Sequence, residues 1–229
     1  MAAVGVVTGM AAEAERLLSG NGLPRDAVAV AGPSAVAAEA TARELLAAGA
    51  RGLVSFGLAA GLHPTLKAGI VVLATEVVTP EGEVLATQTL WRGRLAVHLR
   101  RGGPLLEARL AGVDRPVVGV DQKAALLASS GAAAADMESH GVARAARAAN
   151  VPFIVVRAVA DAADRVLPQA ALTALRPDGR VAYGRLLRRL LGHPGELRGL
   201  AGLAIDSWFA FAALRRAARY GRRDLLFPG

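Results

Sequence analysis

The stretch Pro152-Phe-Ile-Val-Val-Arg-Ala-Val159 decides the fold, because it is the strongest strand candidate in the chain. A short, almost continuous apolar run rich in β-branched residues is typical of a strand buried on both faces of a parallel sheet. Shorter runs of the same kind precede it and alternate with alanine-rich stretches of helical length. The expected strands are residues 4–7, 28–31, 52–56, 70–75, 84–89 and a short one at 132–135. The expected helices are residues 11–18, 34–48, 123–129 and 139–149, with Ser34 as an N-cap.

This alternation predicts an α/β fold in which a mostly parallel sheet is covered by helices on both faces. Ligands of such folds gather at the carboxyl ends of the strands, where loops and helix N-termini converge. The segments that follow the predicted strands are therefore the places to look for a site. They are residues 8–13, 55–61, 136–138 and 160–164.

Composition excludes several classes of protein. With 53% hydrophobic residues among 229, the chain is not a disordered protein. It has no cysteine, which excludes disulfide scaffolds, thiolate zinc sites and cysteine nucleophiles, and its four histidines lack metal-ligand spacing. We therefore expect neither a metal nor a cofactor. The first residues make a poor signal peptide, and no uncharged run reaches the roughly 20 apolar residues of a membrane span. These features predict a cytoplasmic protein.

The net charge of +8 is concentrated at one end of the chain. Residues 1–175 are close to neutral, whereas residues 176–229 are rich in arginine, and we treat the two parts as a catalytic domain and a basic helical extension. Apolar residues of the extension recur at helical spacing. They are Leu200, Ala201, Ala204, Ile205, Trp208, Phe211 and Ala212. This face fits either packing within the protein or a dimer interface, or else an interfacial membrane helix whose arginines meet anionic headgroups. No motif in the extension indicates nucleic-acid binding.

Acidic residues stand at three predicted helix starts. Glu13 follows the first strand, Asp136 and Glu138 precede a helix, and Asp161 follows the strongest strand. By spacing alone each is explained as a cap or a first-turn acid that interacts with the helix dipole. The glycine-rich segment 55–61 matches neither GxGxxG nor the phosphate-loop pattern.

Taken together, four segments resemble one enzyme family. Val4-Gly-Val-Val-Thr-Gly-Met-Ala-Ala-Glu13 resembles the opening of the nucleoside phosphorylase and nucleosidase superfamily, in particular the methylthioadenosine/S-adenosylhomocysteine nucleosidases. Ser55-Phe-Gly-Leu-Ala-Ala-Gly-Leu-His-Pro64 is similar to the second glycine loop of that family, and Ala135-Asp-Met-Glu-Ser139 to its ribose motif. Residues 150–164 resemble its last core strand and catalytic aspartate. The sequence Asp136-Met-Glu-Ser-His140, the shortened middle and the basic tail look most like the hopanoid-associated branch.

The resemblance implies a Rossmann-like three-layer α/β/α sandwich with a C-terminal helical extension, which cleaves an N-glycosidic bond. It implies that Asp161 protonates the purine, that Glu13 orients or deprotonates the attacking water, and that Glu138 and Met137 bind the ribose. The remaining pocket positions that it implies are Thr8, Gly9, Gly57, Leu58, Ala59, Asp136 and Ala160.

The sequence also departs from the family pattern. Leu58 stands where the family has a small hydroxyl residue, Ala160 replaces a serine, and no aromatic residue lies near residues 114–116. A phosphate site is therefore in doubt, and water is slightly favoured over phosphate as the nucleophile, although phosphate stays open as a co-substrate.

The expected reaction is adenine release from an adenosyl compound, with adenosylhopane in hopanoid side-chain biosynthesis as the first candidate. The alternatives are a methylthioadenosine/S-adenosylhomocysteine nucleosidase, a purine nucleoside phosphorylase, and a nucleoside-binding regulatory protein without activity. The expected partners are a small or lipid-linked nucleoside, a further copy of the chain in a homodimer or larger oligomer, and a membrane surface, but no nucleic acid.

Overall fold

The computed structural model describes residues 4–21, 23–168, 197–222 and 225. The predicted boundary between residues 175 and 176 and the first part of the extension, up to residue 196, lie outside this range. The described strands are β1 (Gly5–Thr8), β2 (Val28–Val30), β3 (Leu53–Gly61), β4 (Val71–Val78), β5 (Val84–Ala86), β6 (Leu105–Gly112), β7 (Ala134–Asp136) and β8 (Phe153–Asp161). The described helices are α1 (Ala11–Asn21), α2 (Ala35–Ala47), α3 (Thr89–Gly102), α4 (Val120–Ser130), α5 (Ser139–Ala148) and α8 (Leu197–Tyr220), with a 3-10 turn at Arg25–Ala27.

All eight strands belong to one sheet, which runs in the order β2-β1-β3-β7-β6-β4-β5, while β8 pairs with both β3 and β4. Pairing is parallel between β1 and β2, β1 and β3, β3 and β8, β4 and β6, and β6 and β7. It is antiparallel between β3 and β7, β4 and β5, and β4 and β8. The pairings close a ring through β3, β7, β6, β4 and β8, so the predicted, mostly parallel sheet is mixed and curls on itself.

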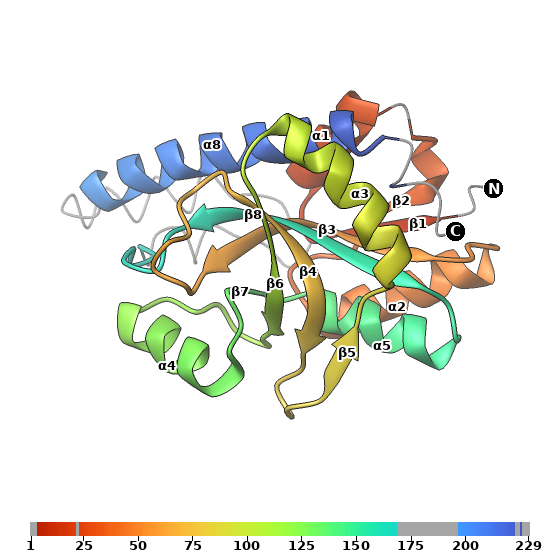
Figure 1. The fold of residues 1–229 in the computed structure, drawn as a ribbon, viewed down its shortest axis with the longest axis horizontal. Helices are drawn as coiled ribbons and strands as arrows, with labels where there is room; N and C mark the ends of the chain where they lie inside the picture. Colours follow the sequence, from red (N-terminus) through yellow and green to blue (C-terminus); the bar gives the residue numbers. More distant parts are fainter. Residues whose placement is uncertain (1–3, 22, 169–196, 223–224, 226–229) are drawn as a thin grey trace.

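Helices cover the sheet on both faces, as the alternation of elements predicts (Figure 1). Helices α1, α3 and α8 pack on one face and α2 and α5 on the other, each with its own cluster of buried apolar residues. The strand predicted at 52–56 continues to Gly61, and the one predicted at 84–89 ends at Ala86 because α3 begins at Thr89. The N-cap assigned to Ser34 is present, since its side chain accepts from the Ala37 amide.

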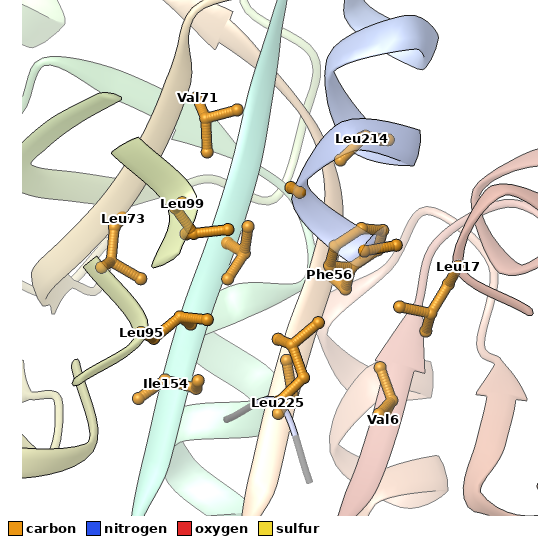
Figure 2. Packing of buried hydrophobic residues seen from close by; sticks show 14 of the residues in the cluster. Val6, Leu17, Phe56, Val71, Leu73, Leu95, Leu99, Ile154, Leu214 and Leu225 are labelled. Atoms are coloured by element: carbon orange, nitrogen blue, oxygen red, sulfur yellow. The ribbon is translucent and has the colours of Figure 1, made fainter. Parts of the chain in front are cut away.

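Helix α8 lies against the sheet and completes the core on its face. Its buried side is made of small residues and one leucine, which lets the helix approach α1 and the strands closely. Figure 2 shows Leu214 beside Phe56, with Leu17 of α1 and Leu225 in the same cluster. The buried residues of α8 are Ala210, Ala213, Leu214, Ala217 and Ala218.

The apolar residues singled out in the sequence lie mostly toward the start of α8, and several of them are exposed. Trp208 is 67% and Ile205 is 59% exposed, and Ala201 and Ala204 are exposed as well. None of the helices among the described residues is long and apolar enough to cross a membrane.

Candidate active site

The four segments meet around a cavity of about 590 Å³ at the end of the sheet where β3, β7 and β8 terminate. Among the predicted residues, those that line the cavity are Glu13, Leu58, Ala59, Asp136, Met137, Glu138, Ala160 and Asp161. Three others lie behind its surface. Thr8 is buried, with its hydroxyl 3.4 Å from the Ala29 carbonyl, while Gly9 and Gly57 touch the carboxylates of the site.

The Glu13 carboxylate is held by three backbone amides. Its Oε2 accepts from the amides of Gly9 at 2.9 Å and Met10 at 2.8 Å, and its Oε1 accepts from the Leu58 amide at 2.8 Å. The side chain thus links the loop after β1 to the middle of β3. Burial raises the pKa of Glu13, against the lowering effects of Arg157 and these amides. A carboxylate with a raised pKa is a stronger proton acceptor than an ordinary one.

Arg157 of β8 is a member of the site that the sequence analysis did not single out. It is fully buried, forms ion pairs with Asp136 and, at 3.2 Å, with Glu138, and donates to Ser55 Oγ at 2.6 Å. Its Nη1 atom has no hydrogen-bond partner among the described residues. The signal was available, because a charged residue inside the most apolar strand must find a partner in the interior.

Ser139 and Asp136 complete the network around this guanidinium. The Ser139 hydroxyl donates to Asp136 and accepts from Arg157 Nη2 at 3.1 Å, and the Ser139 amide lies 3.3 Å from both carboxylate oxygens of Asp136. Asp136 therefore caps the start of α5, as its spacing predicts, and also balances the charge of Arg157. Both interpretations of this acid are compatible.

Glu138 lines the cavity, and its pKa lies well above the ordinary value of a glutamate. Burial is the main cause that raises its pKa to about 8; Arg157 opposes the shift, while Asp136 and Glu13 add to it. Burial disfavours the charged form, and because three carboxyl groups also share one guanidinium, the site cannot hold all three as anions without cost. Glu138 is thus able to donate as well as accept a hydrogen bond at neutral pH.

Two glycines are required by close approach. A Cβ atom at Gly57 would lie 2.3 Å from Arg157 Nη1 and 2.6 Å from Glu13 Oε1, and one at Gly9 would lie 2.7 Å from Glu138 Oε1. The glycine positions of the two loops therefore allow the charged side chains to reach the floor of the site.

Asp161 stands apart from this network. It is buried, and its Oδ2 accepts from Lys123 Nζ of α4 at 2.5 Å. Burial raises the pKa of Asp161, while the Lys123 ammonium opposes that shift. Lys123 is the second residue of the site that the sequence analysis did not single out, although it is one of only two lysines in an arginine-rich chain.

The rest of the cavity wall is largely apolar. Residues 113 and 115–118 form one side, where the family aromatic is missing, and Leu58 lies on the strand side. Leu167 and Leu203 add two more apolar side chains, and Leu203 comes from α8. The C-terminal helix therefore forms part of the site. Among the described residues, no group of three His, Cys, Asp or Glu side chains could hold a metal ion.

Comparisons with known proteins place the chain in a family. The sequence profile described as "Phosphorylase superfamily" matches residues 6–191. The chain belongs to this superfamily. Its membership makes it a nucleoside-cleaving enzyme, and the cavity with its acidic residues is the active-site candidate. The comparison with curated proteins finds no match.

Solved structures of nucleosidases share the fold of this superfamily member. A 5'-methylthioadenosine/S-adenosylhomocysteine nucleosidase of Helicobacter pylori is 22% identical, with 70% of this chain and 85% of that chain covered and a TM-score of 0.62. An S-adenosylhomocysteine nucleosidase of Streptococcus pyogenes is 20% identical, with 70% and 84% covered and a TM-score of 0.63. A futalosine hydrolase mutant of Helicobacter pylori is also 20% identical, with 82% and 99% covered and a TM-score of 0.63.

Proposed function

We propose that this enzyme hydrolyses the N-glycosidic bond of an adenosyl compound and releases adenine. The observation that carries the proposal is the meeting of Glu13, Glu138 and Asp161 on one cavity, although they come from three distant parts of the chain. All three carboxyl groups are buried and burial raises the pKa of each, and carboxyl groups perturbed in this way around one cavity are typical of catalytic sites. The roles below are those that the family resemblance implies.

In the proposed reaction the bond between the ribose C1' and the purine N9 breaks, and its electron pair goes to the purine. Asp161 gives a proton to N7, so adenine leaves as a neutral base. Glu138 and Met137 hold the ribose, and the nearby carboxylates favour the positive charge that develops on the sugar. A water molecule attacks C1' and passes a proton to Glu13.

Water fits the floor of the site better than phosphate does. The amides of Gly9, Met10 and Leu58, which could have formed an anion-binding loop, already donate to the Glu13 carboxylate. The Arg157 guanidinium faces Asp136, Glu138 and Glu13, so its charge is already balanced. A phosphate ion would meet carboxylates where it needs donors.

The apolar wall supports a substrate with a large apolar substituent, and adenosylhopane remains the first candidate. Leu58 stands in place of a hydroxyl residue, and residues 116–118, Leu167 and Leu203 add apolar side chains, so that Arg115 is the one basic residue among the described residues that line the cavity. A methylthioadenosine/S-adenosylhomocysteine nucleosidase is the closest alternative, and a phosphorylase is the alternative that uses the same substrates with phosphate.

The test is a product assay with adenosylhopane and methylthioadenosine in parallel, with and without phosphate. The proposal expects adenine and a free sugar without phosphate, and a higher kcat/KM for adenosylhopane. A ribose 1-phosphate product that appears only with phosphate would overturn the hydrolase assignment. If no adenine is released from either compound while both bind, the protein is a nucleoside-binding regulator instead.

We further propose that the outer side of α8 contacts an anionic membrane surface on which a lipid-linked substrate would reside. Exposed residues at helical spacing form one stripe along α8 and just beyond its end, and its apolar part lies beside the cavity residue Leu203. Aromatic side chains can enter the interface while each arginine gains about 1 kcal/mol from anionic headgroups. The stripe consists of Ala201, Ala204, Ile205, Trp208, Arg215, Arg219 and Arg222.

Co-sedimentation with anionic and neutral liposomes tests this contact. Removal of the extension is unsuitable, because α8 belongs to the core, so the variant is Ile205→Ser with Trp208→Ser. The matched control is Val36→Ser, at a site 80% exposed on α2. We expect the wild type to bind anionic vesicles, and this binding should weaken as salt is added. The α8 double variant should bind less than the wild type, whereas the Val36→Ser control should bind equally well. Equal binding by all variants, or none at low salt, would contradict the proposal.

The homo-oligomer implied by the resemblance is a separate proposal, which analytical ultracentrifugation tests.

A further inference from the structure

Lys123 is a fully buried ammonium group with a complete set of acceptors. Its Nζ donates to Asp161 Oδ2 at 2.5 Å and to the carbonyls of Ala162 and Arg165, both at 2.8 Å. A lysine ammonium has three N–H donors, so each of them has a partner here. Lys123 is also the one fully buried side chain among the described residues of α4.

The three contacts do two separate things. The two carbonyl contacts fix the turn that follows β8, between Asp161 and Arg165. The third contact engages Oδ2 of the carboxylate that lines the cavity and leaves Oδ1 to serve a substrate. Anchoring the turn requires only the carbonyl contacts, so the ion pair with Asp161 calls for a chemical explanation.

Other charged groups face Asp161, but they largely balance each other. Arg165, in the turn after β8, donates to Asp206 of α8 at 2.9 Å. Asp206 raises the pKa of Asp161 and Arg165 lowers it, and both effects are smaller than that of Lys123. From α4, the turn and α8 together, Lys123 is thus the dominant cation at this carboxyl group.

We infer that Lys123 is a positioning residue that orients Asp161 and stabilises the carboxylate left behind when Asp161 gives its proton to N7. This inference rests on the proposed function. Before the step, Asp161 holds a proton on Oδ1 and its Oδ2 accepts from the ammonium. In the step the O–H bond breaks, an N7–H bond forms, and the new negative charge lies next to Lys123, which keeps its own three protons.

The ion pair between Lys123 and Asp161 opposes the effect of burial on the Asp161 carboxyl group. A carboxyl group in an apolar cavity keeps its proton too firmly to be a good acid at neutral pH. An adjacent ammonium lowers the pKa of that carboxyl group and so opposes the effect of burial. Burial and Lys123 therefore act in opposite directions on one group, as expected for an acid that must release its proton to a weak base.

The decisive experiment compares Lys123→Met with wild type on two substrates, an adenosyl compound and its N7-methylated form. The methylated purine already carries the positive charge that a proton would supply, so its departure needs no acid. We expect Lys123→Met to lose at least about tenfold in kcat with the ordinary substrate, and at most the roughly 10²–10⁴-fold contribution of a general acid. With the methylated substrate we expect less than about threefold loss. The matched control is Lys67→Met, which changes the only other lysine, an exposed one.

The pH profile gives a second readout that a purely structural role would not move. The high-pH limb of kcat/KM reports loss of the acid's proton. Without the ammonium the pKa of Asp161 rises, so this limb should move to higher pH in Lys123→Met. An equal loss on both substrates, or an unshifted limb, would overturn the inference. If Lys123→Met does not fold, Lys123→Gln replaces it, since Gln keeps two N–H donors for the carbonyls and lacks the charge.

Titration of Asp161 itself separates this inference from the proposed function. Carbon-13 NMR of the Asp161 carboxyl group, assigned with Asp161→Asn, should show a higher pKa in Lys123→Met than in wild type. An unchanged titration would overturn the inference even in an active enzyme. If wild type releases no adenine from any substrate, the proposed function fails, and the NMR result still decides whether Lys123 controls this carboxyl group.

Discussion

Single residues in this site are explained by the way in which charge is balanced in the interior. Arg157 is surrounded by Asp136, Glu138 and Glu13. Burial is the main cause that raises the pKa values of the two glutamates, and for Glu138 the neighbouring carboxyl groups add to it. Asp161 has a separate partner in Lys123. The site thus has two separate charge centres, one around a guanidinium and one around an ammonium.

Asp161→Asn should separate catalysis from stability at the residue scale. We expect glycosidic cleavage to fall by about 10²–10⁴-fold, because an amide cannot donate the acid proton, while the folded structure persists. Asp164→Asn is the matched control, since Asp164 lies three residues later and is exposed. Adenine release under single-turnover conditions and the circular dichroism spectrum provide the measurements. Near-wild-type turnover by Asp161→Asn would show that Asp161 has only a structural role.

Gly57→Ala should be damaging despite the addition of only one methyl group. The new Cβ would meet Arg157 Nη1 and Glu13 Oε1, and both side chains are held by other contacts. We expect a loss of about 1–3 kcal/mol in the free energy of unfolding and a strong fall in kcat. Gly93→Ala in α3, where a Cβ meets nothing within 4 Å, should instead be neutral or stabilising. Urea unfolding of both variants compares them directly; equal stabilities would contradict the crowding argument.

At the scale of elements, α8 behaves as part of the catalytic domain. Leu214→Ala should destabilise the protein by about 2–5 kcal/mol, because this side chain is fully buried against the sheet. Leu90→Ala, at a helical position that is 71% exposed, should change stability by less than about 0.5 kcal/mol. Thermal or urea unfolding measures both. A small effect of Leu214→Ala would show that α8 adds little to the core.

The order of elements could largely be predicted from the sequence, and the exceptions have physical reasons. β6 and α3 were missed, because residues 105–112 mix apolar residues with Glu107 and Arg109, and α3 is rich in arginine. The closure of the sheet through β4 and β8 depends on pairing between distant segments, which no local pattern encodes. The start of α8 shows the same limit, since its apolar periodicity did not reveal which face is buried.

The candidate site, like the fold, could be predicted from the sequence only in part. Motif resemblance indicated Glu13, Glu138 and Asp161, which lie at or shortly after the ends of strands and match the family pattern. Arg157 and Lys123 act from within a strand and a helix, and their roles depend on distances across the fold of 2.5 to 3.2 Å. Their unusual context, an arginine in an apolar strand and a rare lysine, was the only local sign.

For the molecule as a whole, the buried acids predict how stability depends on pH. The pKa values of Glu13, Glu138 and Asp161 are all raised in the folded protein, that of Glu138 from 4.5 to about 8. Between these two values the folded state binds more protons than the unfolded state. The free energy of unfolding should therefore fall as the pH rises from about 5 to 8, by up to about 1.4 kcal/mol per pH unit for each such proton.

Urea unfolding of wild type and Glu138→Gln at pH 5.5, 7 and 8 checks this prediction. The amide cannot ionise, so the loss of stability toward pH 8 should be smaller in Glu138→Gln than in wild type. The variant should also lose turnover, because an amide stabilises the developing charge on the sugar less well than a carboxylate. The two readouts arise from the same burial: an environment that makes Glu138 costly to ionise in the empty site also strengthens its interaction with a cationic sugar. A wild-type stability that rises between pH 5.5 and 8 would show that Glu138 is ionised at little cost, which would remove this link between the fold and the chemistry.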